Sequence, residues 1–115
     1  MHEFHAVEAL FKQAAAKAKE YKAVKVTKVV FSLGEMVGFD DGSIKLYFDD
    51  LAKGTIFEKA LLVINHKAPR LQCKDCSNVF EDKSKQFKCP QCCSASLVVS
   101  TGKEFYLENI EIETE

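Results

Sequence analysis

The sequence predicts a small α/β (α+β) fold, in which a three-stranded sheet carries two helices and a zinc-ribbon-like module is inserted between two strands. Three observations support this. Amphipathic helical segments alternate with strongly apolar strands over roughly the first 66 residues. All five cysteines then lie between Cys73 and Cys93. A last apolar strand follows them, and a length of 115 residues fits one domain with a small insert.

Residues 3–21 are predicted to form the first helix, because apolar side chains recur at steps of three and four and several alanines favour helix. The apolar positions are Phe4, Val7, Leu10, Phe11, Ala14, Ala18 and Tyr21. Residues 24–33 are rich in β-branched side chains and predict a strand, and their alternation fails at 29–31. The second half of this strand is therefore expected to be covered on both faces.

A second helix is predicted over residues 43–53. The preceding Asp-Asp-Gly-Ser segment, residues 40–43, offers capping oxygens, and Gly54 is a suitable stop. Its apolar spacing is carried by Ile44, Tyr47, Phe48 and Leu51.

Two more strands are predicted, over 60–66 and 103–113, with Pro69 breaking the chain before the cysteines. In the last strand Tyr106, Ile110 and Ile112 are expected to share one face. The domains predicted from this order are 1–67 together with 102–115, and a metal module over 68–101. The chain is expected to be a monomer or a homodimer.

Charge and hydropathy exclude several classes of protein. Sixteen basic residues face seventeen acidic ones, a net charge of −1, which argues against a nucleic-acid binder. The longest apolar run, 60–64, is far too short for a membrane helix. No secretory leader is evident in the charged first twenty residues, so we expect a cytoplasmic protein in a reducing compartment.

The cysteines form two CxxC pairs, Cys73 with Cys76 and Cys89 with Cys92. Two tight turns that each present two thiolates complete the tetrahedron that Zn²⁺ prefers. The alternative is a pair of redox dithiols, but neither pair stands at the start of a βαβ helix. Four thiolates leave no open position, so the zinc is expected to be structural and to supply the folding energy of the module.

A small apolar core is expected around this zinc, formed by Val79, Phe80, Phe87, Leu97 and Val98. Cys93 is interpreted as a thiol beside the site, with a role as reserve ligand or redox-sensitive thiol as the alternative.

The chain opens with Met1, His2 and Glu3, followed by His5. The Met1 amine, the His2 backbone nitrogen and the His2 imidazole could present three nitrogens in one plane, which suits Ni(II) or Cu(II). The fourth donor would be Glu3 or His5. On residues alone the simpler interpretation is stronger: His2 and His5 are solvated, and Glu3 favours a helix N-terminus.

These segments in combination resemble the HypA/HybF family of nickel metallochaperones. The resemblance rests on MHE at the N-terminus, LGEMVGFD after the first strand, LAKGT after the second helix, and CKDCSNVF, CPQCCS and GKEFYLENIEIE in the last third. It implies that His2 is the essential nickel ligand, supported by the N-terminal backbone and Glu3, and that the four paired cysteines hold structural zinc. It departs from the family at Cys93, where Gly is usual, and at His5, where a small polar residue is common.

The resemblance also implies a role and partners. The protein would deliver Ni(II) for [NiFe]-hydrogenase maturation, acting with a HypB-type GTPase on a hydrogenase large subunit, and some members serve urease through its accessory proteins. No nucleophile–base pair or phosphate loop is visible, so no enzyme activity is expected. The alternative is a zinc-ribbon module that binds protein or RNA without a nickel function.

Overall fold

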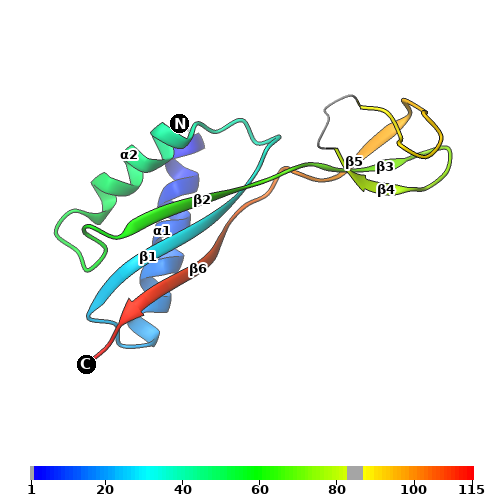
Figure 1. Cartoon of the computed structure of the whole chain (residues 1–115). Coiled ribbons are helices and arrows are strands. Elements are labelled where there is room, and N and C mark those ends of the chain that lie inside the picture. Colours follow the sequence, from blue (N-terminus) through cyan, green and yellow to red (C-terminus); the bar gives the residue numbers. More distant parts are fainter. Residues whose placement is uncertain (1, 83–86) are drawn as a thin grey trace. The chain divides into compact units, whose positions relative to one another are not determined.

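The structure is a computed structural model that describes residues 2–82 and 87–115, with the side chain of His2 outside the described part (Figure 1). Its contacts divide the chain into two units, which are described separately. The first comprises Met1–Ser32, Phe39–Asn65 and Phe105–Glu115, and the second comprises Leu33–Gly38 and His66–Glu104. The segment 68–101 predicted as the metal module lies within the second unit.

The first unit is built from two helices on one face of a sheet (Figure 1). The helices are α1 (His2–Glu20) and α2 (Asp41–Ala52), and the strands are β1 (Lys25–Gly34), β2 (Leu61–Lys67) and β6 (Phe105–Glu113), in the order β2-β1-β6. The helices, the small sheet and the clustered cysteines confirm the predicted fold class. No helix formed by the described residues has the length and apolar character needed to cross a bilayer.

Hydrogen bonds fix the strand directions. Val26 N donates to Ile56 O near the start of β1, and Glu35 N donates to Lys67 O just after its end, so β1 and β2 run parallel. Helix α2 is the crossover between them, as parallel strands require. Val24 N donates to Glu113 O at 2.8 Å, so the start of β1 meets the end of β6 and these two strands are antiparallel.

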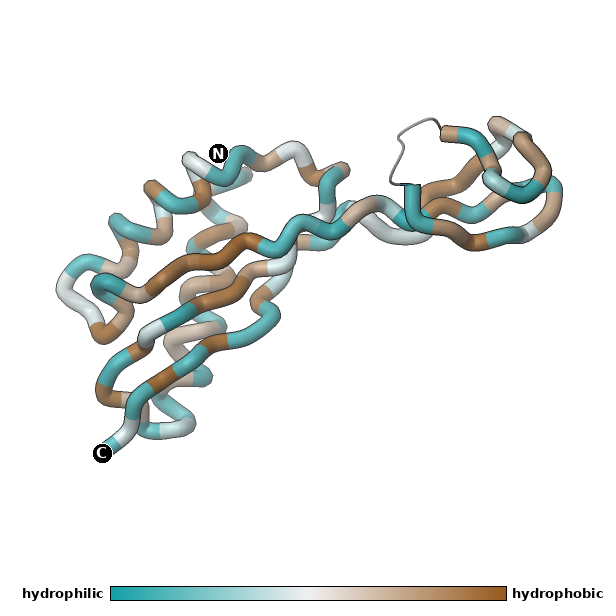
Figure 2. Tube along the Cα trace, in the orientation of Figure 1, coloured by the Kyte–Doolittle hydropathy of each residue, from teal (hydrophilic) through white to brown (hydrophobic). Residues whose placement is uncertain are grey.

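Aromatic rings fill the core between the helices and the sheet. Phe31 of β1 meets Phe48 of α2 edge to face, with ring centroids 6.1 Å apart. Phe11 of α1 lies 5.7 Å from Phe48 and 4.7 Å from Phe57. Every residue from Val29 to Gly34 is buried, as the failed alternation of this strand predicts. Figure 2 shows the apolar residues concentrated along β1 and β2.

The prediction that Tyr106 shares one face of β6 with Ile110 and Ile112 is wrong. Phe105 and Leu107 are half-buried and Tyr106 is 44% exposed, whereas Ile110 and Ile112 are the half-buried residues further along. The inward side chains thus change from odd to even positions between Leu107 and Ile110. One extra residue in a strand, a β-bulge, has this effect.

The second unit contains three short antiparallel strands, β3 (Arg70–Cys73), β4 (Val79–Glu81) and β5 (Leu97–Thr101), in the order β4-β3-β5. The central Leu71 is 2% exposed and lies in register between Phe80 and Val99. The expected module core is therefore largely wrong, because Val79, Phe87 and Val98 are 43%, 53% and 46% exposed. Strands of three to five residues bury few side chains, and the buried hydrophobic side chains among the described residues of 70–101 are Leu71, Cys73 and Cys89.

Candidate metal centres

Four thiols converge in the second unit. The sulfur atoms of Cys73, Cys76, Cys89 and Cys92 all lie within 4.8 Å of one another. The Sγ atoms of Cys73 and Cys92 are 3.5 Å apart, and those of Cys76 and Cys89 are 3.6 Å apart. Four sulfurs at about 2.3 Å from a tetrahedral Zn²⁺ would be separated by roughly 3.8 Å. The predicted ligand set is thus brought together with the spacing that zinc requires.

The two CxxC segments have the same backbone hydrogen bonds. Cys73 N donates to Asn78 O, and Ser77 N donates to Cys73 O. The second pair repeats the pattern: Cys89 N donates to Ser94 O at 2.9 Å, and Cys93 N donates to Cys89 O at 2.8 Å. Each turn closes with a residue in the left-handed region, Ser77 at φ 64° and Cys93 at φ 62°. The repeated pattern aims two sulfurs from each turn at one point.

Within each pair the first cysteine is buried and the second is exposed. The backbone amide of Cys76 is the main cause that lowers the pKa of the Cys73 thiol. Burial opposes charge on Cys89, but the backbone amide of Cys92 helps to lower the pKa of Cys89 to about 6. The backbone amide of Ser94 favours the Cys92 thiolate, yet the Cys73 thiol and desolvation raise the pKa of Cys92 to about 12.

These shifts describe one cluster that shares negative charge unequally. Backbone amides favour sulfur anions at Cys73 and Cys89. The amides of Asn78 and Ser94 also favour charge on Cys76 and Cys92, but burial and the neighbouring sulfurs outweigh them and raise the pKa of both exposed thiols. A divalent cation removes this conflict by stabilising four thiolates together. The donor set is soft and closed, which fits Zn²⁺ in a structural role and leaves no position for a substrate.

Side chains around the cluster were not indicated by the cysteine spacing. Asn78 Nδ2 lies 3.9 Å from Cys89 Sγ and can donate to a thiolate there. Ser94 Oγ donates to the carboxylate of Asp75, which ties one CxxC turn to the other. Cys93 is exposed and lies outside the group of four sulfurs, as expected for a thiol beside the site.

The N-terminal end of α1 lies against the start of α2. Glu3 Oε1 accepts a hydrogen bond from the backbone N of Asp40 at 3.0 Å. Asp40 is itself the N-cap of α2, since its Oδ2 accepts from Ser43 N at 3.0 Å. Glu3 and Asp40 are 37 positions apart, so sequence spacing gave no sign of this contact. One oxygen of the Glu3 carboxylate is thus fixed by the backbone of Asp40.

The remaining residues predicted for nickel are only partly described. His5 is exposed, and its ring meets Phe4 edge to face at 5.8 Å. Phe4 in turn packs on Tyr47 of α2 at 5.3 Å. His2 is the first residue of α1, and Met1 with its amine lies outside the described residues. The ligand set Met1, His2, Glu3 and His5 therefore remains a prediction.

An α/β domain with a four-cysteine module inserted before its last strand defines a class of metal-handling protein. The family described as "Hydrogenase/urease nickel incorporation, metallochaperone, hypA" matches residues 1–112. A hydrogenase maturation factor HypA from Caldanaerobacter subterraneus is 40% identical over 114 residues, covering 98% of this chain and 100% of that protein. Another from Dehalococcoides mccartyi is 34% identical and covers 100% of this chain and 97% of its own.

Solved structures agree with the sequence comparison. The solution structure of the Ni metallochaperone HypA from Helicobacter pylori is 28% identical, with a TM-score of 0.70 and 98% of each chain covered. A second solution structure of a HypA protein is 29% identical, with a TM-score of 0.75, and covers 100% of this chain and 98% of its own. The chain belongs to the HypA family of hydrogenase maturation factors.

Proposed function

We propose that this protein carries Ni(II) on its N-terminus and delivers it for the maturation of [NiFe]-hydrogenase, while a structural Zn²⁺ stays on Cys73, Cys76, Cys89 and Cys92. The observation that carries the proposal is the family match, because it begins at residue 1 and so includes Met1, His2 and Glu3. The protein is proposed to act without enzyme activity of its own, in the cytoplasm.

The two sites differ in the way this task requires. Zinc would be held by four sulfurs whose positions are fixed by paired backbone hydrogen bonds. Such a closed ligand set would release its ion slowly. Nickel would be held by a few nitrogen and oxygen donors at the end of a helix, where another protein can reach the ion. An affinity near micromolar, about −8 kcal/mol, would permit both capture and release.

Partners follow from the same proposal. A HypB-type GTPase would act with this protein, since no phosphate-binding loop is visible in its own sequence. The recipient would be a hydrogenase large subunit, with the urease accessory machinery as a second recipient. The partner would complete the coordination of nickel and so draw it from the N-terminus.

The test is Ni(II) titration calorimetry on untagged, zinc-loaded protein. The native terminus is essential, because one added residue would displace the amine from the His2 chelate. We expect near-micromolar binding that His2→Ala abolishes and His66→Ala, which changes an exposed histidine of β2, leaves unchanged. Binding that is indifferent to His2 would refute the proposal and favour a zinc-ribbon interaction module.

Glu3 allows coordination to be separated from positioning. In Glu3→Gln the amide oxygen can still accept from Asp40 N, but the side chain loses the charge that attracts a cation. If the carboxylate is a ligand, Glu3→Gln weakens nickel binding while thermal unfolding stays near that of the wild type. If Glu3 only anchors the helix, Glu3→Gln binds nickel normally and only Glu3→Ala, which loses the hydrogen bond, unfolds earlier.

A further inference from the structure

We propose that the outer edge of β6, with the groove between β6 and α1, binds an extended basic segment of a partner protein, which adds to the sheet as a further strand. The surface lies entirely within the first unit. It is used by neither metal centre, so the proposal goes beyond the nickel function. Three observations carry it: a cavity, an unpaired strand edge, and the charge of that edge.

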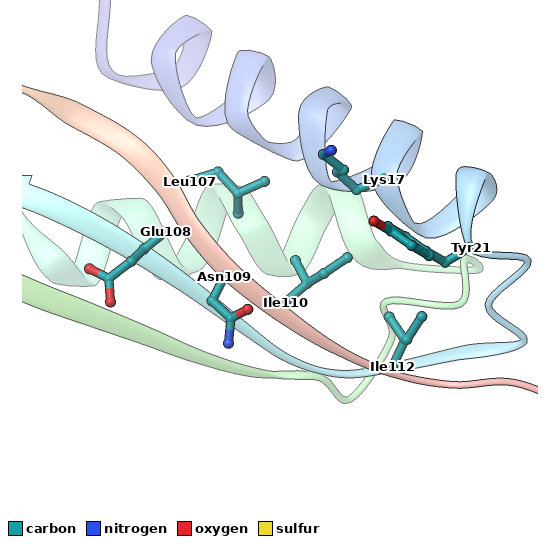
Figure 3. Close-up of a pocket in the computed structure, with 7 residues that line it drawn as sticks. All are labelled: Lys17, Tyr21, Leu107, Glu108, Asn109, Ile110 and Ile112. Carbon is teal, nitrogen blue, oxygen red and sulfur yellow. The ribbon is translucent and has the colours of Figure 1, made fainter.

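The cavity has a volume of about 420 Å³ and is lined on one side by Lys17 of α1 and by Tyr21, which directly follows this helix. Its other side is β6, from Leu107 to Ile110 together with Ile112. Figure 3 shows the Tyr21 ring between the helix and the strand, Lys17 lying along the helix, Ile110 and Ile112 pointing toward the helix, and Asn109 pointing away. Tyr21 is 60% exposed, so an apolar ring already stands at the rim with one side in solvent. A large apolar side chain from outside would fill this space.

Beside the cavity the backbone of β6 is available. In the sheet formed by the described residues β6 is an outermost strand. The carbonyl of Glu113 accepts from Val24 N, so the main-chain groups of Glu113 face β1. Main-chain groups alternate in direction along a strand, which turns those of Ile112 and Ile110 away from β1. Their side chains meet α1 while their N–H and C=O groups face outward, as strand addition requires.

The negative charge of this edge favours a basic partner segment. Residues 105–115 contain four glutamates and no lysine or arginine, and one of them, Glu108, accepts hydrogen bonds from Ser32 and Asn65. Among them, Glu111 pairs with Lys28 of β1 at 3.7 Å, with more than a third of each side chain still exposed. Two such edges brought together would oppose like charges, which disfavours a second copy of this chain. A strand with lysine or arginine on its outer face and apolar side chains toward α1 would satisfy both the edge and the cavity.

The position leaves the N-terminus free. Lys17 lies in the last turn of α1 and Tyr21 directly follows the helix, and 19 helical residues span about 28 Å. A partner could therefore hold this protein by β6 while the metal-binding terminus stays open to the same partner or to a recipient.

The probe is a synthetic ten-residue peptide that alternates lysine with valine, capped at both ends. It would be titrated into the zinc-loaded full chain and followed by amide chemical shifts and hydrogen exchange. We expect saturable shifts confined to β6 and the last turns of α1, with new protection at the amides of Ile110 and Ile112. Shifts that are scattered, or that map to α2 and the second unit, would overturn the proposal.

Two control peptides separate the contributions. Replacing every lysine by glutamate should weaken binding by at least about tenfold at low salt. Methylating every second amide nitrogen keeps the charge and removes the ladder, and should abolish the protection at Ile110 and Ile112. If the glutamate peptide bound as tightly as the lysine peptide, the role of charge would be refuted. If the methylated peptide did so, strand addition would be refuted.

A matched pair of variants tests the edge itself. Glu113→Lys should weaken the lysine peptide about fivefold, whereas Glu58→Lys makes the same charge change at an exposed residue outside β6 and should have little effect. Equal effects of both variants would show that the peptide is attracted by net charge alone, which would overturn the proposal. Sedimentation of the free protein as a dimer, with β6 protected from exchange, would assign the edge to a second copy and overturn the proposal.

Discussion

Gly34 ends β1 at a point of very close backbone contact, and replacing it by alanine gives a sharp test of the structure. A Cβ added at Gly34 would lie 2.2 Å from the carbonyl oxygen of Gly102 and 3.0 Å from Lys103 N. Both neighbouring groups are backbone, so no side-chain rotation can relieve the overlap. Gly34→Ala must therefore push the two chain segments apart by about 1 Å to reach ordinary contact.

The cost can be worked from the bonds that hold these segments together. Gly34 N donates to Glu104 O at 2.8 Å, and Met36 N donates to Gly102 O at 2.9 Å. A separation of about 1 Å breaks both, at about 1 kcal/mol each, with a further penalty for any group left buried without a partner. We expect Gly34→Ala to destabilise the second unit by about 2–3 kcal/mol.

Gly38→Ala is the matched control, because it makes the same chemical change four residues away. Gly38 has φ +83° and nothing lies within 4 Å of an added Cβ, so only the backbone conformation is penalised, by about 1 kcal/mol. The assay is urea unfolding of zinc-loaded protein, with hydrogen exchange at the amides of Gly34 and Met36. The predicted overlap is contradicted if Gly34→Ala lowers the free energy of unfolding no more than Gly38→Ala does. It is also contradicted if the amides of Gly34 and Met36 keep their protection from exchange.

Three further predictions concern the cysteines. An aromatic disulfide reagent should count one reactive thiol, Cys93, in the zinc-loaded protein and five after chelation in denaturant; two or more in the loaded protein would contradict the four-ligand assignment. Cys76→Ala should unfold the metal module and leave α1 and the main sheet intact, because the proposed zinc would supply the folding energy of the module; loss of chemical-shift dispersion across the whole NMR spectrum would contradict it. Cys93→Gly should stabilise the module by about 0.5 kcal/mol, because glycine accepts the φ of 62° without strain and loses only part of this gain to chain entropy; chelator competition measures it, and faster zinc loss would show that Cys93 contributes to the site.

The sequence predicted the elements of the first unit because the local signals there agree. The expected helix over 43–53 is observed as Asp41–Ala52, since the capping oxygen that suggested its start is the N-cap Asp40. The grouping of the four paired cysteines could equally be predicted, because CxxC spacing alone brings two thiolates to one turn. In both cases the physical cause lies within a few residues of the position it determines.

The predictions that failed depend on contacts between residues distant in the sequence, which local sequence patterns do not indicate. Tyr106 was predicted to share a face with Ile110 and Ile112 because nothing in its neighbourhood signals the shift between Leu107 and Ile110. Val79 and Val98 were assigned to a core because they are apolar, yet both lie in register with the exposed Gln72 on one face of a three-stranded sheet. In a module this small the metal cluster occupies the centre that apolar side chains would otherwise fill.

The hydrogen bond between Glu3 and Asp40 bears directly on the proposed nickel function. A carboxylate at the start of a helix is usually solvated, and it then contributes little to a metal site because ordering it costs side-chain entropy. Here one oxygen is already held at 3.0 Å by the backbone of the residue that caps α2. Part of the entropic cost is therefore met when the protein folds, and nickel would have only the N-terminal residues left to order. A carboxylate that is anchored through one oxygen at the end of a helix would bind a cation together with few other donors and could still release it, unlike a site closed by four thiolates.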